Sequence, residues 1–216
     1  MKKIELVNVS KSIDHDDILK DVSLDFCSGN CYGLIGQNGS GKTMLLRLIA
    51  GLIKPTTGIV KFNNEIIEYG SKLPFSIGVI IENAGLYQEL TCFDNLKLLA
   101  QIRKVTSKQR IEESIKRVGL DPKNKKKLRK YSLGMRQRAV MAQAIMEAPD
   151  VLLLDEPMNS LDKDGVDIFR NIILQEKDRG AIIIISSHIE EDINILCDIV
   201  YKVKNGIVTK RQEMKE

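Results

Sequence analysis

The sequence predicts an α/β fold with a mostly parallel sheet, a small antiparallel β lobe and an inserted helical part. Residues 151–154 and 182–185 are short, wholly apolar runs, as expected of strands covered on both faces. A helical pattern at about residues 163–177 separates them, and alternation of strands with helices favours parallel pairing. With 43% hydrophobic residues, the chain of 216 can bury one compact core.

The first part of the chain predicts a series of strands with one helix. Alternation or short apolar runs indicate strands at residues 4–9, 18–26, 31–35, 59–62 and 77–81. The helix after the third strand begins at Thr43 and is apolar around much of its circumference, which favours burial against a sheet. Gly51 and Pro55 are expected to end it, near Leu52.

A helical character begins after the strand at residues 77–81. Helices are predicted to start near residues 91, 107 and 132. Thr91 and Asp94 have the spacing of a capping pattern, which fixes the first of these starts. We therefore expect a helical subdomain at residues 83–147, inserted into an α/β core made of residues 1–82 and 148–216. Near the end of the chain, Asn205-Gly206 predicts a hairpin turn.

Composition and charge exclude several classes of protein. Thirty-three basic and twenty-nine acidic residues give a net charge of +4, which neither demands nor excludes nucleic acid. The four cysteines are scattered and there are two histidines, so we expect neither a zinc site nor a disulfide framework. No apolar run approaches the ~20 residues of a membrane span, and the N-terminus lacks a signal-peptide pattern. The expected location is the cytoplasm.

Residues 36–43, Gly-Gln-Asn-Gly-Ser-Gly-Lys-Thr, match the pattern G-x-x-x-x-G-K-[S/T] between a strand and a helix. Backbone N–H groups of such a loop, with the helix start, bind nucleotide phosphates. Lys42 is expected to reach the β- and γ-phosphates and Thr43 to bind Mg²⁺ through its hydroxyl. The alternative is a glycine-rich turn before a core helix. The predicted nucleotide-binding residues of this segment are Gly36, Asn38, Gly39, Ser40, Gly41, Lys42 and Thr43.

Asp155 and Glu156 directly follow the strand at residues 151–154, at the edge where open α/β sheets bind ligands. A carboxylate at this edge can hold Mg²⁺, and its neighbour can orient and deprotonate an attacking water. We assign the first role to Asp155 and the second to Glu156. Two acids in a solvated turn are the alternative.

Three segments resemble the ABC-type ATPases, the nucleotide-binding subunits of ABC transporters. Residues 151–162, Val-Leu-Leu-Leu-Asp-Glu-Pro-Met-Asn-Ser-Leu-Asp, resemble their Walker B strand, catalytic glutamate and D-loop. Residues 131–138, Tyr-Ser-Leu-Gly-Met-Arg-Gln-Arg, resemble their signature motif, and His188 stands where the family has its switch histidine. The resemblance covers essentially the whole chain and implies a P-loop NTPase core with a helical subdomain.

The resemblance also implies a dimer that forms on ATP binding. Ser132 and Gly134 would then contact the ATP held by a second protomer, and Ser160 and Asp162 would lie at the dimer interface. The second protomer is expected to be an identical chain or a related ATPase subunit. The residues alone predict less: Ser132 is a good helix N-cap, and a single histidine such as His188 is usually core or surface filler.

The chain departs from the common family pattern at several positions, and in these it resembles the branch that serves bacitracin export and lantibiotic self-immunity. Glu82 stands where most members have glutamine, and the signature has Tyr131 and Met135 at its ends. Glu82 is expected to be either a Mg²⁺ ligand or a solvated loop acid. Ile13 stands near the position where the family stacks adenine on an aromatic ring, so we expect apolar packing of the base and a less secure preference for ATP over GTP.

The sequence therefore predicts an ATP-hydrolysing subunit with ATP and Mg²⁺ as cofactors, peripherally attached to the inner face of the cell membrane through a separate permease. Export of an antimicrobial peptide or drug-like compound is the expected task, with a lipid or another substrate as an alternative. A soluble ABC-type ATPase acting on ribosomes or nucleic acid is a further alternative, favoured by the basic run at residues 123–130. That run lacks aromatic residues for base stacking, so we expect no nucleic acid partner. A P-loop kinase or GTPase would not explain the signature motif.

Overall fold

Two sheets form the framework of the computed structural model, which describes residues 1–81, 85–104 and 106–211, leaving aside the side chains of residues 191 and 192. The four-stranded sheet is antiparallel and has the order β2-β1-β4-β5. Its strands are β1 (Lys3–Ile13), β2 (Asp16–Cys27), β4 (Thr57–Phe62) and β5 (Glu65–Ile66). This sheet is the predicted antiparallel lobe.

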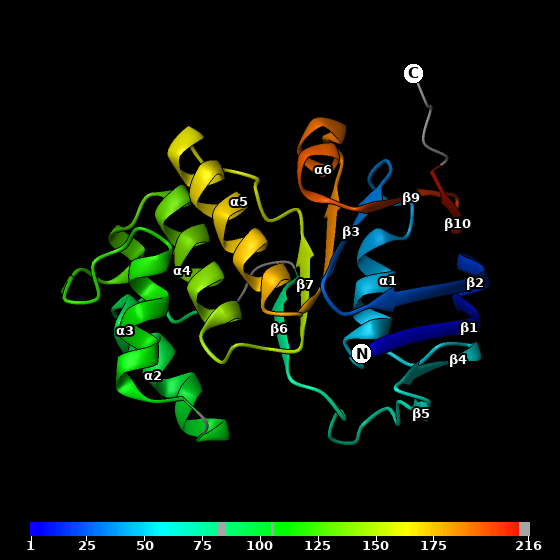
Figure 1. Cartoon of the computed structure of the whole chain (residues 1–216), viewed down its shortest axis with the longest axis horizontal. Coiled ribbons are helices and arrows are strands. Elements are labelled where there is room, and N and C mark those ends of the chain that lie inside the picture. Colours follow the sequence, from blue (N-terminus) through cyan, green and yellow to red (C-terminus); the bar gives the residue numbers. More distant parts are fainter. Residues whose placement is uncertain (82–84, 105, 212–216) are drawn as a thin grey trace.

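The six-stranded sheet has the order β10-β9-β3-β8-β7-β6 and is parallel except for the antiparallel β9–β10 pair. Its strands are β3 (Asn30–Ile35), β6 (Ile77–Ile80), β7 (Val151–Asp155), β8 (Ile182–Ser187), β9 (Ile199–Lys204) and β10 (Ile207–Lys210). The helices are α1 (Lys42–Ile49), α2 (Cys92–Arg103), α3 (Lys108–Arg117), α4 (Leu133–Ile145), α5 (Lys163–Asp178) and α6 (Glu190–Leu196). In Figure 1, α2, α3 and α4 lie at the end of the molecule opposite the four-stranded sheet.

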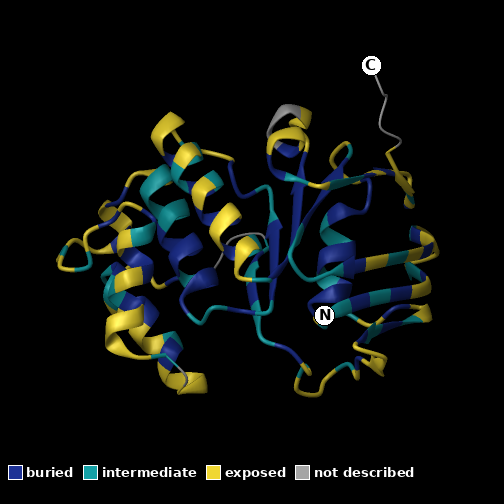
Figure 2. Cartoon of the chain, in the orientation of Figure 1, coloured by how far each residue is buried: buried dark blue, intermediate teal, exposed yellow. Residues whose placement is uncertain are grey.

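The parallel sheet separates two hydrophobic cores. Side chains alternate between its faces, so Leu152 and Ile183 pack among the helices α2 to α5, while Leu153 and Ile184 pack on the side of α1 and the four-stranded sheet. The central strands are dark along their length in Figure 2, between helices whose outer faces are exposed. Burial of each aliphatic side chain of this kind contributes about 1.5–3 kcal/mol to the stability of the fold. All four residues of the isoleucine run 182–185 are fully buried.

The helices α2, α3 and α4 start at the predicted residues, and each has a side-chain N-cap. Thr91 Oγ1 accepts a hydrogen bond from Asp94 N at 3.1 Å, and Ser107 Oγ accepts one from Arg110 N at 3.3 Å. Ser132 Oγ accepts one from Met135 N at 3.2 Å. A cap of this type is worth about 1 kcal/mol. Within the described ranges, no helix has the length and apolar character needed to cross a membrane.

The structure corrects some element boundaries. α1 ends at Ile49, earlier than expected, because Gly51 adopts a left-handed conformation with φ 70°; Leu52 is consequently 63% exposed instead of buried. The elements β5 and α6 were not predicted, whereas the hairpin turn predicted at Asn205-Gly206 joins β9 to β10. β5 has two residues and α6 has seven, which is too short for a periodic pattern to stand out.

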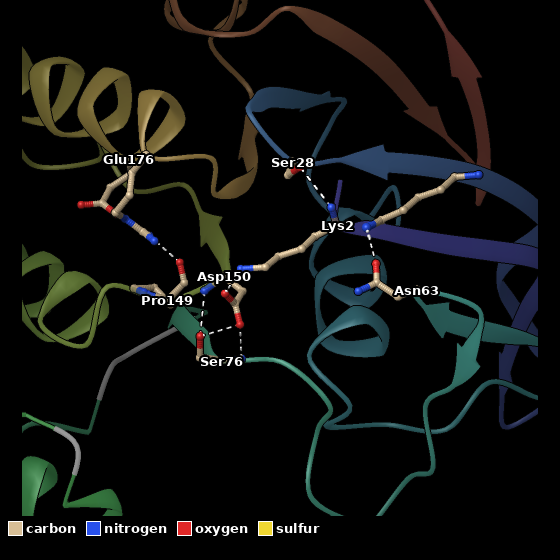
Figure 3. A network of polar contacts seen from close by, with 9 residues as sticks. Lys2, Ser28, Asn63, Ser76, Pro149, Asp150 and Glu176 are labelled. Atoms are coloured by element: carbon tan, nitrogen blue, oxygen red, sulfur yellow. Dashed lines mark hydrogen bonds and ion pairs between the residues drawn. The ribbon is translucent and has the colours of Figure 1, made fainter.

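A polar network ties the N-terminus to the start of β7 (Figure 3). The Asp150 carboxylate accepts hydrogen bonds from Ser76 N at 2.9 Å, Ser76 Oγ at 2.8 Å and Lys2 Nζ at 2.5 Å. Lys2 N in turn donates to Ser28 Oγ at 3.2 Å. Burial alone would raise the pKa of Asp150, but the hydrogen bonds from Lys2 and Ser76 outweigh it and hold this pKa below its usual value.

Candidate active site

The glycine-rich segment 36–43 connects β3 to α1 and takes a backbone path that side chains would obstruct. Gly39 and Gly41 have φ of 78° and 112°, the left-handed region that favours glycine. A Cβ on Gly36 would lie 2.2 Å from Val203 O, so glycine alone fits there without a shift. A hollow of about 430 Å³ opens beside the segment, bordered by residues 35–40, His188, Glu190 and residues 202–205 at the end of β9 and the start of the turn after it.

Lys42 holds its charge inside this loop. Its side chain is 5% exposed, and Nζ donates to Gly36 O at 2.6 Å and to Gln37 O at 3.1 Å. The same Nζ lies 3.9 Å from Glu156 Oε1. A buried ammonium ringed by loop carbonyls and one carboxylate provides a fixed positive charge for an anion that enters the loop.

Thr43, Asp155 and Ser186 form a chain of oxygen atoms across three elements. Thr43 Oγ1 donates to Asp155 Oδ2 at 2.6 Å, and Ser186 Oγ donates to Asp155 Oδ1 in a short hydrogen bond. The contact follows from register, because Asp155 and Ser186 are partners in the parallel β7–β8 pair. Direct hydrogen bonds thus connect the end of the glycine-rich segment to the ends of β7 and β8.

The donor set fits Mg²⁺. A threonine hydroxyl and a carboxylate are hard oxygen ligands, and Mg²⁺ is usually bound by one or two carboxylates with substrate phosphates. In the described part of the chain there is no cluster of three or more His, Cys, Asp or Glu residues that could hold a metal unaided. The remaining ligands would therefore come from a nucleotide and water. Ser40 Oγ and Glu156 Oε1 are buried without a hydrogen-bond partner, as expected beside a polar ligand site.

Glu156 stands in a strained conformation next to a histidine. Its φ is 46°, which is uncommon for a residue other than glycine. Its backbone N–H is shared between Ser186 O at 3.1 Å and Ser186 Oγ at 3.2 Å. Its Oε2 lies 2.9 Å from His188 Nδ1. The structure therefore brings Lys42, Thr43, Asp155, Glu156 and His188, all singled out in the sequence, into one connected group.

The signature segment and the D-loop segment contact each other instead. Ser132 and Gly134 lie at the start of α4, where a Cβ on Gly134 would be 3.1 Å from Ser160 O. Arg138 Nη2 donates to Asp162 Oδ1 at 2.6 Å, which, with the N–H of Gly165, holds the pKa of Asp162 below its usual range. In the ranges that the structure describes, no hydrogen bond or ion pair joins Ser132 or Gly134 to residues 36–43.

One predicted nucleotide contact lies apart from the connected group, and one predicted Mg²⁺ ligand is not described. Ile13 is the last residue of β1, is 43% exposed and does not border the hollow. Glu82 lies outside the described residues, so its proposed contact with Mg²⁺ stays a prediction. Ser186 was not predicted as a site residue, although it lies near the end of β8, the strand adjacent to the one that ends at Asp155. The shared sheet edge was the signal that could have revealed it.

A phosphate-binding loop between a parallel strand and a helix, with two acidic residues at the end of a nearby strand, defines a P-loop nucleotide-binding protein. The family model described as ABC transporter matches residues 19–159. The chain belongs to this family: it is an ATP-binding subunit of an ABC transporter, with the ATPase domain that hydrolyses ATP, as predicted.

Relatives and solved structures agree with this assignment. An uncharacterized ABC transporter ATP-binding protein of Bacillus subtilis, YybJ, is 49% identical over 94% of this chain and 93% of its own length. The bacitracin transport ATP-binding protein BcrA of Enterococcus faecalis is 35% identical over 99% of this chain and 70% of its own length. The lantibiotic transport ATP-binding protein SrtF of Streptococcus pyogenes is 34% identical over 97% and 90%. A solved ATP-binding subunit of an ABC transporter has a TM-score of 0.86 at 26% identity, over 97% of this chain and 90% of that structure.

Proposed function

We propose that this chain hydrolyses ATP with Glu156 as the base, dimerises on ATP binding and drives a separate permease that exports an antimicrobial peptide. The single observation that carries the proposal is the position of the Glu156 carboxylate. Its Oε2 lies 2.9 Å from His188 Nδ1, and its Oε1 lies 3.9 Å from Lys42 Nζ. A carboxylate placed between a phosphate-binding lysine and a histidine can accept a proton from water next to the terminal phosphate.

Each group has a distinct task in the proposed reaction. Lys42 binds the β- and γ-phosphates, Glu156 orients and deprotonates the attacking water, and His188 holds the Glu156 carboxylate and contacts the γ-phosphate. Thr43 and Asp155 would hold Mg²⁺, which when bound neutralises charge on the phosphates. Catalysis then depends mainly on fixed positions and charges, in line with the hydrogen-bonded group described above.

The dimer proposal rests on the surface around the start of α4. Ser132 caps this helix and Leu133 next to it is 64% exposed. A helix N-terminus whose serine can donate its hydroxyl proton, followed by a glycine, suits a phosphate from another chain. Ser132 and Gly134 of one copy would complete the site of its partner, with Ser160 and Asp162 between the two. We propose two identical copies; pairing with a related ATPase subunit is the other outcome.

The cargo proposal rests on the relatives. One relative is named for bacitracin transport and another for lantibiotic transport, and both are aligned with nearly the whole of this chain. We infer an exporter of antimicrobial peptides, with the helical subdomain at residues 83–147 docking the permease at the inner face of the membrane. Purification of the chain with a multispan protein from detergent-solubilised membranes supports this. Recovery with ribosomes contradicts it.

The test of the catalytic proposal is the Glu156→Gln variant. Loss of a general base lowers kcat by about 10²–10⁴-fold. We expect this loss in steady-state hydrolysis, together with an ATP-bound dimer on size exclusion with light scattering. Glu112→Gln on the exposed side of α3, where Glu112 faces Lys108 at 3.7 Å, is the matched control and keeps the parent rate. A Glu156→Gln protein that hydrolyses ATP at the parent rate and stays monomeric would refute the proposal.

A further inference from the structure

We propose that Ser186 is a positioning residue for hydrolysis: its hydroxyl fixes the Asp155 carboxylate and the backbone of Glu156 together. The inference rests on the roles proposed above for those two acids. Ser186 itself lies at the end of β8 and is fully buried. It is therefore a supporting group and does not touch the reacting atoms.

One hydroxyl makes both contacts. Ser186 donates its proton to Asp155 Oδ1 and, through a lone pair, accepts from Glu156 N at 3.2 Å. Its own carbonyl accepts from the same Glu156 N at 3.1 Å. A serine hydroxyl has one donor and two acceptor positions, so this geometry uses its donor on the carboxylate and an acceptor on the backbone.

The Asp155 carboxylate is held at both oxygens. Thr43 from α1 binds Oδ2, and Ser186 from β8 binds Oδ1. The terminal torsion of an aspartate is broad, so two hydrogen bonds from different elements are what fix its plane. Without the Ser186 hydroxyl, one oxygen loses its partner and the plane can turn. A metal bound through Thr43 and Asp155 would then lose part of its preformed site.

Glu156 needs the same support for another reason. A non-glycine residue at φ 46° persists only where its surroundings determine the conformation. The shared hydrogen bond from Glu156 N to two oxygens of Ser186 supplies part of that constraint. Loss of the hydroxyl leaves the carbonyl alone, so the glutamate side chain can move from its place beside His188. An error of about 1 Å in such a place can cost about 10²-fold in rate.

The neighbouring serine provides a matched control. Ser187 is also buried, at 3% exposure, and it follows Ser186 on the same strand. Its hydroxyl accepts from Ile189 N at 3.0 Å and makes no hydrogen bond to Asp155 or Glu156 within the described residues. Ser187→Ala therefore removes a buried, hydrogen-bonded serine hydroxyl next to the site but leaves both acids untouched.

The experiment compares Ser186→Ala, Ser187→Ala and Ser186→Thr in the full chain. For Ser186→Ala we expect kcat to fall about 10–100-fold and the Mg²⁺ concentration for half-maximal rate to rise about 5–20-fold, as for loss of a hydrogen bond to a charged group. Electron paramagnetic resonance measures the binding of Mn²⁺ in the presence of ATP without turnover. The Mn²⁺ affinity should fall by the factor expected for Mg²⁺, about 5–20-fold. Ser187→Ala should change each quantity less than about twofold, and Ser186→Thr, which keeps the hydroxyl, should recover most of the Mn²⁺ affinity.

Unchanged Mn²⁺ binding in Ser186→Ala, or an equal loss in Ser187→Ala, would overturn the proposal. Melting temperatures separate a positioning role from general damage, because the Mn²⁺ measurement is made on protein that is folded at the working temperature. If Ser186→Thr fails to fold, the comparison of the two alanine variants decides alone. Glu156→Gln keeps the outcomes distinguishable: full activity of that variant refutes the proposed function, while its inactivity beside a normal Ser186→Ala refutes only the positioning role.

Discussion

Replacement of Asp150 by asparagine should loosen the attachment of the N-terminus to the sheet (Figure 3). The two Ser76 donors share Asp150 Oδ2, so an amide oxygen there keeps both bonds but without the charge that strengthens them. The Lys2 pair is lost, yet its side chain is 49% exposed and a pair of this kind contributes little. Together these changes amount to about 1–2 kcal/mol in the free energy of unfolding.

The loss should depend on pH in one direction. Because the folded-state pKa of Asp150 lies below its usual value of 3.8, the carboxylate stabilises the fold fully above pH 3.8. That contribution disappears as the pH falls through the lower, folded-state pKa. The difference between the parent and Asp150→Asn should therefore be constant from about pH 5 to pH 8 and shrink toward pH 3.

Urea unfolding followed by circular dichroism at pH 7, 5 and 3 measures this difference. In thermal unfolding at pH 7, the same difference of about 1–2 kcal/mol corresponds to a fall in Tm of roughly 2–8 °C for a domain of this size. Asp167→Asn on α5, with Asp167 57% exposed and 3.6 Å from Arg170, is the control and should move the midpoint little. Equal stability of the parent and Asp150→Asn at pH 7, or a difference of the same size at pH 3, would refute the reasoning.

Two further substitutions test the nucleotide site. Ile13→Tyr introduces an aromatic face where Ile13 is 43% exposed, so ATP should bind about 2–10-fold more tightly by calorimetry, the range of a modest stacking gain; an unchanged affinity would show that the base lies elsewhere. Gly36→Ala forces a Cβ to 2.2 Å from Val203 O and 2.8 Å from Ser40 Oγ, so we expect a loss of about 1–3 kcal/mol in stability and weaker ATP binding by calorimetry. Parent-like stability and affinity would mean that strand β9 yields at Val203 without cost.

Local patterns predicted the parts of the site that lie in single segments. The glycine spacing before Lys42 and Thr43 identified the loop, because only such a backbone can approach phosphate closely. Asp155 and Glu156 followed from their place at the end of an apolar strand. Ser132 was recognised as a cap from its place before an apolar helix, and it is one. Each of these inferences needed only neighbours in sequence.

Contacts between distant segments escaped prediction. The Arg138–Asp162 pair joins residues that are 24 positions apart, and the Asp155–Ser186 contact joins residues 31 apart. Strand order and register decide which side chains meet, and neither is written in the local pattern. The first turn of α6 escaped for a related reason: Ile189 offers no side-chain cap, so no start signal precedes the helix.

The isoleucine run of β8 has a consequence for folding. Residues 182–185 are identical, so displacement of this strand by one position leaves apolar side chains in both cores. Hydrophobic pattern usually opposes such a slip, but here it discriminates weakly. Ser186 breaks the uniformity in one direction, because a slip that brings Ile185 opposite Asp155 removes the hydrogen-bond partner of Asp155 and Glu156. The strand end at the site therefore also marks the alignment against that slip, because a chain folded with Ile185 opposite Asp155 would keep an apolar interior and lose the hydrogen bonds of its site.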